Sequence, residues 1–182
     1  HDPASLRATL SIPDEELYEA HQNRKKELIE HVNHHYHTDF DEHAFTIGFA
    51  RRATAYKRAD LIFSDIDWLK AMAKRVGKIQ LVFGGKAHRN DSIGKEIIKK
   101  IWHLHNQLGD NIKIVYIENY NMDLAKLMTS GVDVWLNTPL RPLEASGTSG
   151  MKAAVNGVPH FSTLDGWWIE GHIENRTGWS IG

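Results

Sequence analysis

The sequence has 182 residues, of which 41% are apolar and 25% are charged, a composition typical of a globular domain with a substantial core. Its formal net charge of -1 favours neither nucleic acid nor a membrane as a partner, so any anion site must be built from local groups. The absence of cysteine excludes disulfides, thiolate metal sites and a thiol nucleophile, and it fits a cytoplasmic enzyme.

The two ends of the sequence indicate a piece of a longer protein, because the chain begins with His1 rather than methionine and stops at Gly182. No secretory leader is visible, and no apolar run approaches the roughly 18 residues of a membrane span. Residues 1–40 predict a helical approach segment. Asp14 is placed to cap a helix with acidic residues in its first turn, and we expect that helix to end near His37.

From residue 41 onward, short apolar runs alternate with segments of helical spacing. The apolar runs predict strands at 44–50, 79–83, 112–117, 132–136 and 159–164. Helical spacing, or a helix start, lies between them at 59–76, 93–108, 122–128 and 147–155. This alternation predicts an α/β fold, a doubly wound, Rossmann-like parallel sheet with helices on both faces. We therefore assign residues 41–182 to one Rossmann-like domain.

The loops that follow the strands hold the candidate functional residues, since ligands of open parallel sheets bind beyond the carboxyl ends of the strands. Four cations follow the first strand within eight residues: Arg51, Arg52, Lys57 and Arg58. Arginine offers paired donors to phosphate and lysine a point charge, although a solvated basic loop explains these residues equally well. Gly84-Gly85 after the second strand permits close approach to a ligand, but an ordinary tight turn is the simpler interpretation.

The most informative stretch runs from Glu144 to Lys152. Gly147, Thr148, Ser149 and Gly150 would open a helix with bare amides and two hydroxyls, which suits a phosphate monoester. Lys152 follows within the first turns, where a partly desolvated amine becomes a candidate for covalent cofactor attachment. The spacing is not that of a nucleotide-binding P-loop. A helix cap with an exposed lysine is the alternative.

Two further features favour structural roles. The histidines at 31, 34, 35 and 37 have helical spacing that could bind a metal, but no carboxylate pattern accompanies them, and we expect no metal site. Trp167-Trp168 could stack on a sugar, but packing in the core is the preferred interpretation.

Several motifs together resemble the glycogen and α-glucan phosphorylase family. The segment Glu144-Ala-Ser-Gly-Thr-Ser-Gly-Met-Lys152 looks like the family's pyridoxal-phosphate lysine segment. The stretch from Phe49 to Arg58 is similar to its phosphate-binding loop. Gly84-Gly-Lys-Ala, Glu118-Asn-Tyr and Leu164-Asp-Gly also match in the family's order, so the resemblance covers the chain from about residue 12 to its end.

For the cofactor, the resemblance implies pyridoxal 5'-phosphate carried covalently on Lys152. It places Arg51, Thr148 and Ser149 beside the cofactor phosphate, with Tyr120 nearby. In this family the phosphate of the cofactor, rather than its ring, assists proton transfer to and from the substrate phosphate.

For the substrates, the resemblance implies phosphorolysis of the terminal glucose of an α-1,4-glucan to glucose 1-phosphate with retained configuration. Arg52 and Lys57 would bind substrate phosphate. Glu144 and the backbone of Ser146 and Gly147 would hold glucose hydroxyls. The partners are thus inorganic phosphate and a glucan such as glycogen, starch or maltodextrin, with no nucleic acid or membrane partner, and a homo-oligomer is compatible with the resemblance.

The resemblance also implies that this chain is one half of a two-domain, B-type glycosyltransferase fold. The glucan-binding N-terminal domain is missing, so the chain alone is expected to be an incomplete enzyme. Gly150 stands where many phosphorylases have asparagine, and the short bacterial and archaeal-type enzymes resemble this chain more. Two rival functions share parts of the pattern: a nucleotide-sugar glycosyltransferase related to glycogen or starch synthase, and a non-catalytic module that binds carbohydrate or phosphate.

Overall fold

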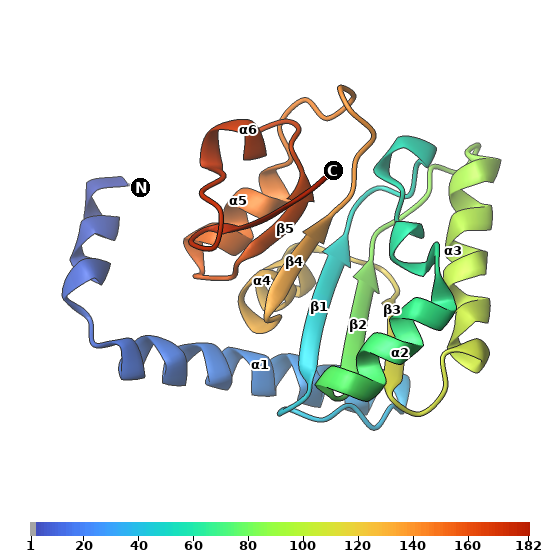
Figure 1. Ribbon diagram of the computed structural model, residues 1–182, viewed down its shortest axis with the longest axis horizontal. Coiled ribbons are helices and arrows are strands. Elements are labelled where there is room, and N and C mark those ends of the chain that lie inside the picture. Colours follow the sequence, from blue (N-terminus) through green and yellow to red (C-terminus); the bar gives the residue numbers. More distant parts are fainter. Residues whose placement is uncertain (1–2) are drawn as a thin grey trace.

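Six strands form the centre of the computed structural model, which describes residues 3–182 (Figure 1). The strands are β1 (Phe45–Ala50), β2 (Ile79–Gly84), β3 (Ile112–Ile117), β4 (Val134–Asn137), β5 (His160–Thr163) and β6 (Gly178–Ile181). The helices are α1 (Asp14–Tyr36), α2 (Ile66–Val76), α3 (Ser92–Leu104), α4 (Met122–Gly131), α5 (Thr148–Val155) and α6 (Trp168–Gly171). Short 3-10 helices are η1 (Pro3–Ser11), η2 (Ala55–Lys57), η3 (Leu61–Phe63) and η4 (His105–Gln107).

The sheet has the strand order β3-β2-β1-β4-β5-β6, and every neighbouring pair is parallel. In the centre, Ile47 of β1 is in register with Leu81 of β2 on one side and with Val134 of β4 on the other. The predicted α/β, doubly wound fold is therefore confirmed. The strand order reverses between β1 and β4, and the crevice outside the carboxyl ends of these two strands is where such sheets bind ligands.

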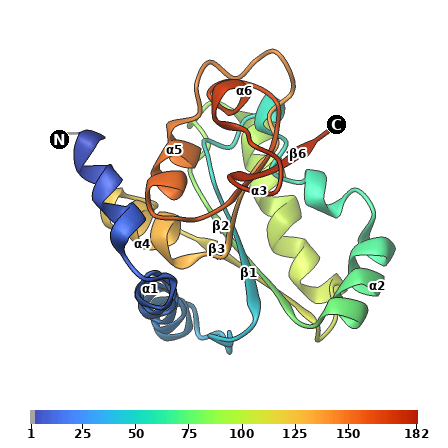
Figure 2. The same cartoon turned by 60° about the vertical axis from the view of Figure 1, so that its left-hand side comes forward.

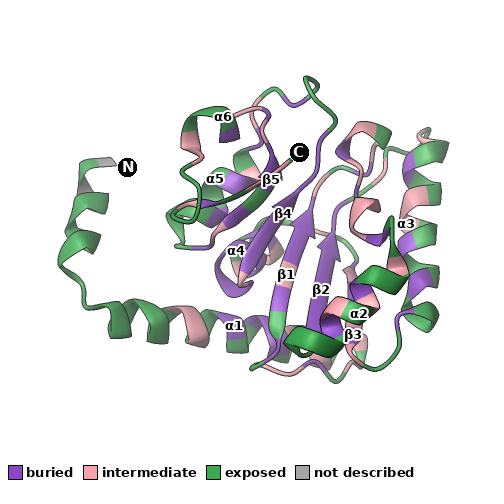
Figure 3. Cartoon of the chain, viewed as in Figure 1, coloured by how far each residue is buried: buried purple, intermediate pink, exposed green. Residues whose placement is uncertain are grey.

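Helices cover both faces of the sheet (Figure 2). On one face, α2 and α3 bury side chains such as Leu69 and Ile101 against Leu81 and Phe83 of β2. On the other, α1, α4 and α5 form a second apolar cluster that includes Met128. The central strands are almost wholly buried, as their continuous apolar runs predicted (Figure 3). Within residues 3–182, no helix is both long and apolar enough to cross a membrane.

The helix starts show where local sequence rules held. Side chains cap three of the helices: Asp65 accepts from the amide of Trp68, Asp91 from Gly94, and Asn121 from two amides of α4. The expected cap by Asp14 is wrong, because α1 already begins at Asp14 and its cap position is Pro13, with no side-chain bond.

Two further features, an interrupted helix and an additional strand, differ from the prediction. The helix expected over 59–76 is interrupted, because Asp65 takes an extended conformation to cap α2, which leaves η3 as a separate turn. The C-terminal strand β6 was not predicted at all. It pairs with β5, and a β-carbon on Gly178 would lie 1.8 Å from the carbonyl oxygen of His160, so the backbones approach closely there.

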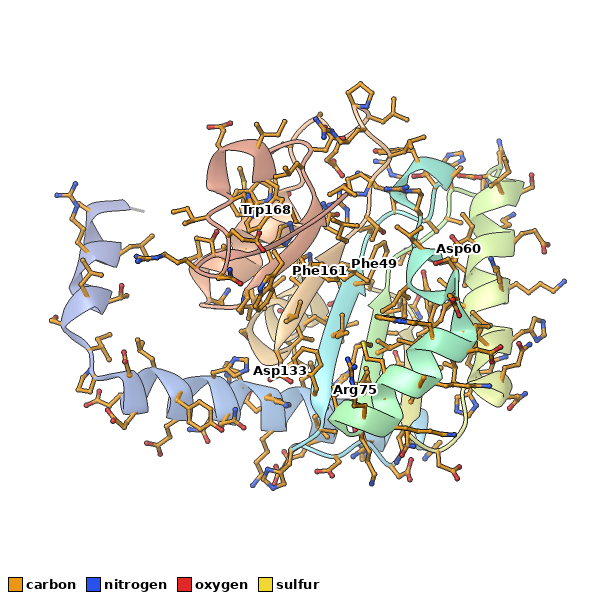
Figure 4. All side chains as sticks on the ribbon, viewed as in Figure 1. Phe49, Asp60, Arg75, Asp133, Phe161 and Trp168 are labelled. Carbon is orange, nitrogen blue, oxygen red and sulfur yellow. The ribbon has the colours of Figure 1, made fainter. Side chains whose placement is uncertain are left out.

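Asp133, which immediately precedes β4, joins helix α1 to the end of the sheet that lies opposite the crevice (Figure 4). One carboxylate oxygen accepts from the Lys25 ammonium at 2.7 Å and from the Thr46 amide at 2.7 Å. The other lies 3.2 Å from His21 Nε2. Burial raises the pKa of Asp133, but the bonds from His21, Lys25 and Thr46 outweigh it and hold the pKa below 3.8. The N-terminal half of α1 is exposed and extends past the sheet (Figure 1).

Replacing Asp133 by asparagine is expected to lower the free energy of unfolding by about 2–3 kcal/mol, because Lys25 would be left buried without its counter-charge. The folded-state pKa of Asp133 is depressed, so its stabilising contribution is present above about pH 4 and is lost as the pH falls through the folded value. Denaturant unfolding of Asp133→Asn and wild type from pH 7 to pH 3 measures both effects. Asp123→Asn, which breaks an exposed pair with Lys126, is the control and should cost under about 0.5 kcal/mol.

Candidate functional site

A buried cluster of three charges stands at the crevice between β1 and β4. Arg51, the first residue after β1, and Lys57, at the end of η2, both donate to one oxygen of Glu144, each at 2.5 Å. The three side chains are between 6% and 9% exposed, so the two cations are held in a medium where their attraction to the carboxylate is strong. Two cations and one anion leave the cluster with a net positive charge. The cluster therefore favours an anion beside it.

The Arg51 guanidinium connects three loops. Besides Glu144, it donates to Asn137 at 2.6 Å and to the Ser149 hydroxyl at 3.4 Å. Asn137 is 2% exposed and in turn donates to Ser162 of β5 at 3.2 Å. Arginine is suited to this task because its planar donors point in fixed directions. Arg51 thus joins the end of β4, the loop that holds Glu144 and the first turn of α5.

Glu144 is itself held in place from its backbone. Its amide donates to one carboxylate oxygen of Asp165 at 2.9 Å, and the other oxygen of Asp165 accepts from Gly166 at 3.0 Å. Asp165 is 5% exposed. Sequence reasoning gave no role to Asp165 or to Asn137, although each directly follows the end of a predicted strand, which is the signal that would have found them.

Helix α5 begins without a side-chain cap, unlike α2, α3 and α4. Its cap residue Gly147 has φ of 86°, and no acceptor among residues 3–182 is bonded to the amides of Thr148 and Ser149. A β-carbon on Gly147 would lie 3.4 Å from an Arg51 nitrogen, an ordinary contact, so it is the positive φ that favours glycine here. Free amides, a helix dipole and a neighbouring guanidinium form an anion cradle, a term used below for the first turn of α5 together with Arg51.

The pocket in front of the anion cradle is open and has a volume of about 570 Å³. Eight of the ten residues singled out by sequence reasoning line it: Arg51, Arg52, Tyr120, Glu144, Ser146, Gly147, Thr148 and Ser149. Burial raises the pKa of Tyr120 to about 12, against the opposing effect of the Arg51 charge, so its hydroxyl stays neutral and can donate. Gly85 also lines the pocket. A β-carbon there would lie 1.9 Å from the Arg51 carbonyl oxygen, so the glycine pair serves close packing of two loops.

The remaining two predicted residues lie just outside this pocket. Lys57 reaches it through its bond to Glu144. Lys152 is exposed and lines a neighbouring groove that also contains Met122 and Met151. On α5, Lys152 stands four residues after Thr148, on the same helical face and one turn beyond the cradle.

The histidines of α1 form no metal centre with their surroundings. His31 and His35 stack at 4.0 Å, and His31 has its pKa lowered by burial and by its His35 and His34 neighbours. Across the described part of the chain, no three His, Cys, Asp or Glu side chains are grouped as a metal ion requires. Of the tryptophan pair, Trp168 is fully buried, as the packing interpretation predicted.

Comparison with known proteins identifies relatives along nearly the whole chain. The model of a family described as carbohydrate phosphorylase matches residues 11–178. The chain is 46% identical to maltodextrin phosphorylase of Thermococcus litoralis, over 94% of the chain and 22% of that protein. It is 44% identical to glycogen phosphorylase of Aquifex aeolicus, over 100% of the chain and 29% of the relative. A glycogen phosphorylase of Mycobacterium tuberculosis is 43% identical over 79% of the chain and 17% of the relative. The chain thus spans less than a third of the length of each of these relatives.

Replacing Asp165 by asparagine is expected to destabilise the site. Asparagine offers one carbonyl oxygen where two carboxylate oxygens accept from Glu144 and Gly166, so one buried amide loses its acceptor, at a cost of about 1–3 kcal/mol. Denaturant unfolding of Asp165→Asn against wild type measures this cost. Asp110→Asn makes the same chemical change at an exposed position and is the control. Equal stability of the two variants would contradict the role given to Asp165.

Proposed function

Because the chain belongs to the carbohydrate phosphorylase family, we propose that its parent protein is an α-1,4-glucan phosphorylase that uses pyridoxal phosphate. The parent would transfer the terminal glucose of a glucan to inorganic phosphate and release glucose 1-phosphate with retained configuration. The observation that carries this proposal is the anion pocket at the strand-order reversal, where free helix amides meet a positively charged cluster. Phosphate, the ionic substrate of the reaction, requires such a pocket.

Two anions need places in the proposed site, the cofactor phosphate and the substrate phosphate. The anion cradle suits the cofactor phosphate, because the amides and hydroxyls of Thr148 and Ser149 lie beside Arg51. Arg52 suits the substrate phosphate. Its side chain is exposed at the same pocket and has no acceptor among residues 3–182, so its donors are free to bind.

The residues around Lys152 fit a cofactor attached to its amine. Lys152 lies one turn beyond Thr148 on the same face of α5, so its amine would be the group that holds the cofactor covalently when the cradle holds the cofactor phosphate. When bound, the cofactor would supply a second phosphate group that exchanges a proton with the substrate phosphate. Tyr120 has a neutral hydroxyl at this pocket and can donate to either phosphate.

Glu144 is proposed to accept hydrogen bonds from glucose hydroxyls, with the backbone of Ser146 and Gly147 beside it. Arg51 and Lys57 hold this carboxylate in place, so it acts as a preset acceptor rather than as a nucleophile. In the reaction, phosphate oxygen bonds to the glucose C1 carbon as the glycosidic C1–O bond breaks. A proton passes from phosphate to the departing glucan oxygen, so atoms and charges balance.

The rest of the parent chain is proposed to complete the site, including the glucan-binding domain. Lys152 is exposed on this chain and opens onto a groove of about 450 Å³. Next to it, a second groove is lined by Leu17, Tyr18 and Val155, apolar side chains that are between 42% and 66% exposed. Positioning of a glucan and exclusion of water both require walls that this chain does not supply. Family membership favours phosphorolysis over transfer from a nucleotide sugar, and a purely binding role would need no reactive lysine.

Arg52→Ala in the full-length protein is expected to weaken phosphate binding without affecting the fold. Loss of a charge-assisted bond worth about 1.5–3 kcal/mol corresponds to a rise of about 10- to 150-fold in the Michaelis constant for phosphate. Initial rates at varied phosphate, together with the unfolding midpoint, separate binding from stability. Arg89→Ala removes an equally exposed cation away from the pocket and should leave the constant unchanged. An unchanged constant for Arg52→Ala would remove this residue from the phosphate site.

Lys152→Ala in the full-length protein is expected to abolish covalent retention of pyridoxal phosphate and nearly all phosphorolysis while the fold survives. Lys152→Arg should not restore retention, because a guanidinium stays protonated and is a poor nucleophile. Borohydride reduction followed by peptide mapping locates the attachment. Lys126→Ala, on the same groove as Lys152, is the matched control and should retain the cofactor. A label on Lys86, or an active enzyme without any label, would show that the assignment to Lys152 is wrong.

A further inference from the structure

Five nitrogen atoms lie buried beneath α5 without a hydrogen-bond partner among residues 3–182: Trp135 Nε1, His160 Nδ1 and Nε2, Trp167 Nε1 and Trp168 Nε1. His160 begins β5, is 0% exposed, and stands in register with Trp135 on β4. Its ring lies 4.7 Å from the ring of Trp168, edge-on, and 5.4 Å from that of Trp167. Buried polar nitrogens usually have hydrogen-bond partners. Hydrogen bonding therefore does not explain why these aromatic rings are buried together here.

The first turn of α5 rests directly on two of these rings at Gly150. A β-carbon at that position would lie 2.5 Å from His160 Cε1, 2.9 Å from His160 Nε2 and 2.8 Å from Trp167 Nε1. Real β-carbons essentially never come this close to other atoms. The helix can therefore approach the rings only because residue 150 has no side chain. Gly150 follows Ser149 directly, so this contact fixes the turn that carries the free amides of the anion cradle.

Trp167 touches the anion cradle at further points. Its amide donates to the carbonyl oxygen of Ser146 at 2.8 Å. Its ring atom Cδ1 would lie 3.5 Å from a β-carbon on Gly147. One tryptophan thus contacts the residue before the cap, the cap itself and the first turn of the helix. The loop after β5 supports the cradle from below, whereas α2, α3 and α4 begin with side-chain caps.

We propose that His160 and Trp167 are positioning residues, which support α5 at Gly150 and thereby set the direction in which the amides of Thr148 and Ser149 meet a phosphate group. The inference rests on the proposed function in so far as the ligand is the phosphate of pyridoxal phosphate. Burial and the Arg51 charge lower the pKa of His160 to about 3, so the ring is neutral and adds no charge beneath the cradle. Support comes from the shape of the ring rather than from its nitrogens.

The test uses the full-length protein after removal of the cofactor, with the dissociation constant for pyridoxal phosphate and the unfolding midpoint as readouts. Gly150→Ala forces the turn away from the rings and should weaken binding at least about tenfold. His160→Ala removes the support and should weaken binding about three- to tenfold. In Gly150→Ala/His160→Ala the two nearest ring atoms of His160 are gone. The double variant should therefore bind more tightly than Gly150→Ala alone, although Trp167 Nε1, 2.8 Å from the added β-carbon, still opposes full recovery. General loss of structure would not produce this gain.

Two controls and one conservative variant complete the test. Ala154→Ser adds one atom to an exposed position of α5, and His172→Ala removes a ring that packs on Trp168 at 5.1 Å. Both should bind pyridoxal phosphate as wild type does. His160→Phe keeps a ring under Gly150 and should bind within about threefold of wild type, which tests the support even if Gly150→Ala does not fold.

The outcomes separate this inference from the proposed function. Tight binding by wild type, with equal binding by Gly150→Ala or by His160→Ala, would overturn the positioning role and leave the proposed function standing. A double variant as weak as Gly150→Ala would also overturn it. Failure of the wild-type protein to bind pyridoxal phosphate would overturn both.

Discussion

The carboxylate of Glu144 is the interaction on which the site depends. It accepts from Arg51 and Lys57 through a single oxygen, and those cations come from the loop after β1, whereas Glu144 comes from the loop after β4. These two loops diverge at the reversal of strand order, which is what opens a crevice there. Without the carboxylate, the two cations of the β1 loop would be buried with no counter-charge from the other side of the crevice. The Glu144 carboxylate thus joins the two loops. Because it neutralises only one of the two cations, the cluster keeps a net positive charge.

The parallel sheet explains why so few contacts suffice to build this arrangement. The carboxyl ends of β1 and β4 are neighbours, so Arg51 and Asn137 are brought within hydrogen-bonding distance by strand pairing alone. Asp165 enters from the end of β5, one strand further along the sheet. Each of these strands thus adds one polar residue to the edge: Arg51 donates to Asn137, and Asp165 accepts from the amide of Glu144.

Much of this could be predicted from the sequence, and the reasons for the failures are physical. Four of the five predicted strands were found because they are apolar runs that are largely buried, whereas β5 has polar side chains and an exposed Phe161. β6 was missed because Gly178-Trp-Ser-Ile lies at the sheet edge, where only part of the strand is buried and the apolar signal is weak. Arg51 and Glu144 were singled out by residue type and by resemblance. Their direct contact could not be predicted, because residues that are 93 positions apart in the sequence give no local signal of a contact.

Helix α5 shows the clearest conflict between local and global requirements. A side-chain cap at residue 147 would stabilise an isolated helix by about 1 kcal/mol, but it would occupy the amides that a phosphate needs. The chain instead places glycine at the cap and holds the turn through rings on β5 and the loop that follows it. Gly150 allows this close packing, because His160 and Trp167 fill the space that an asparagine side chain would need. The N-terminus of α5 thus lacks the usual side-chain cap and is supported by rings instead. This arrangement is expected of a site selected for ligand binding rather than for helix stability.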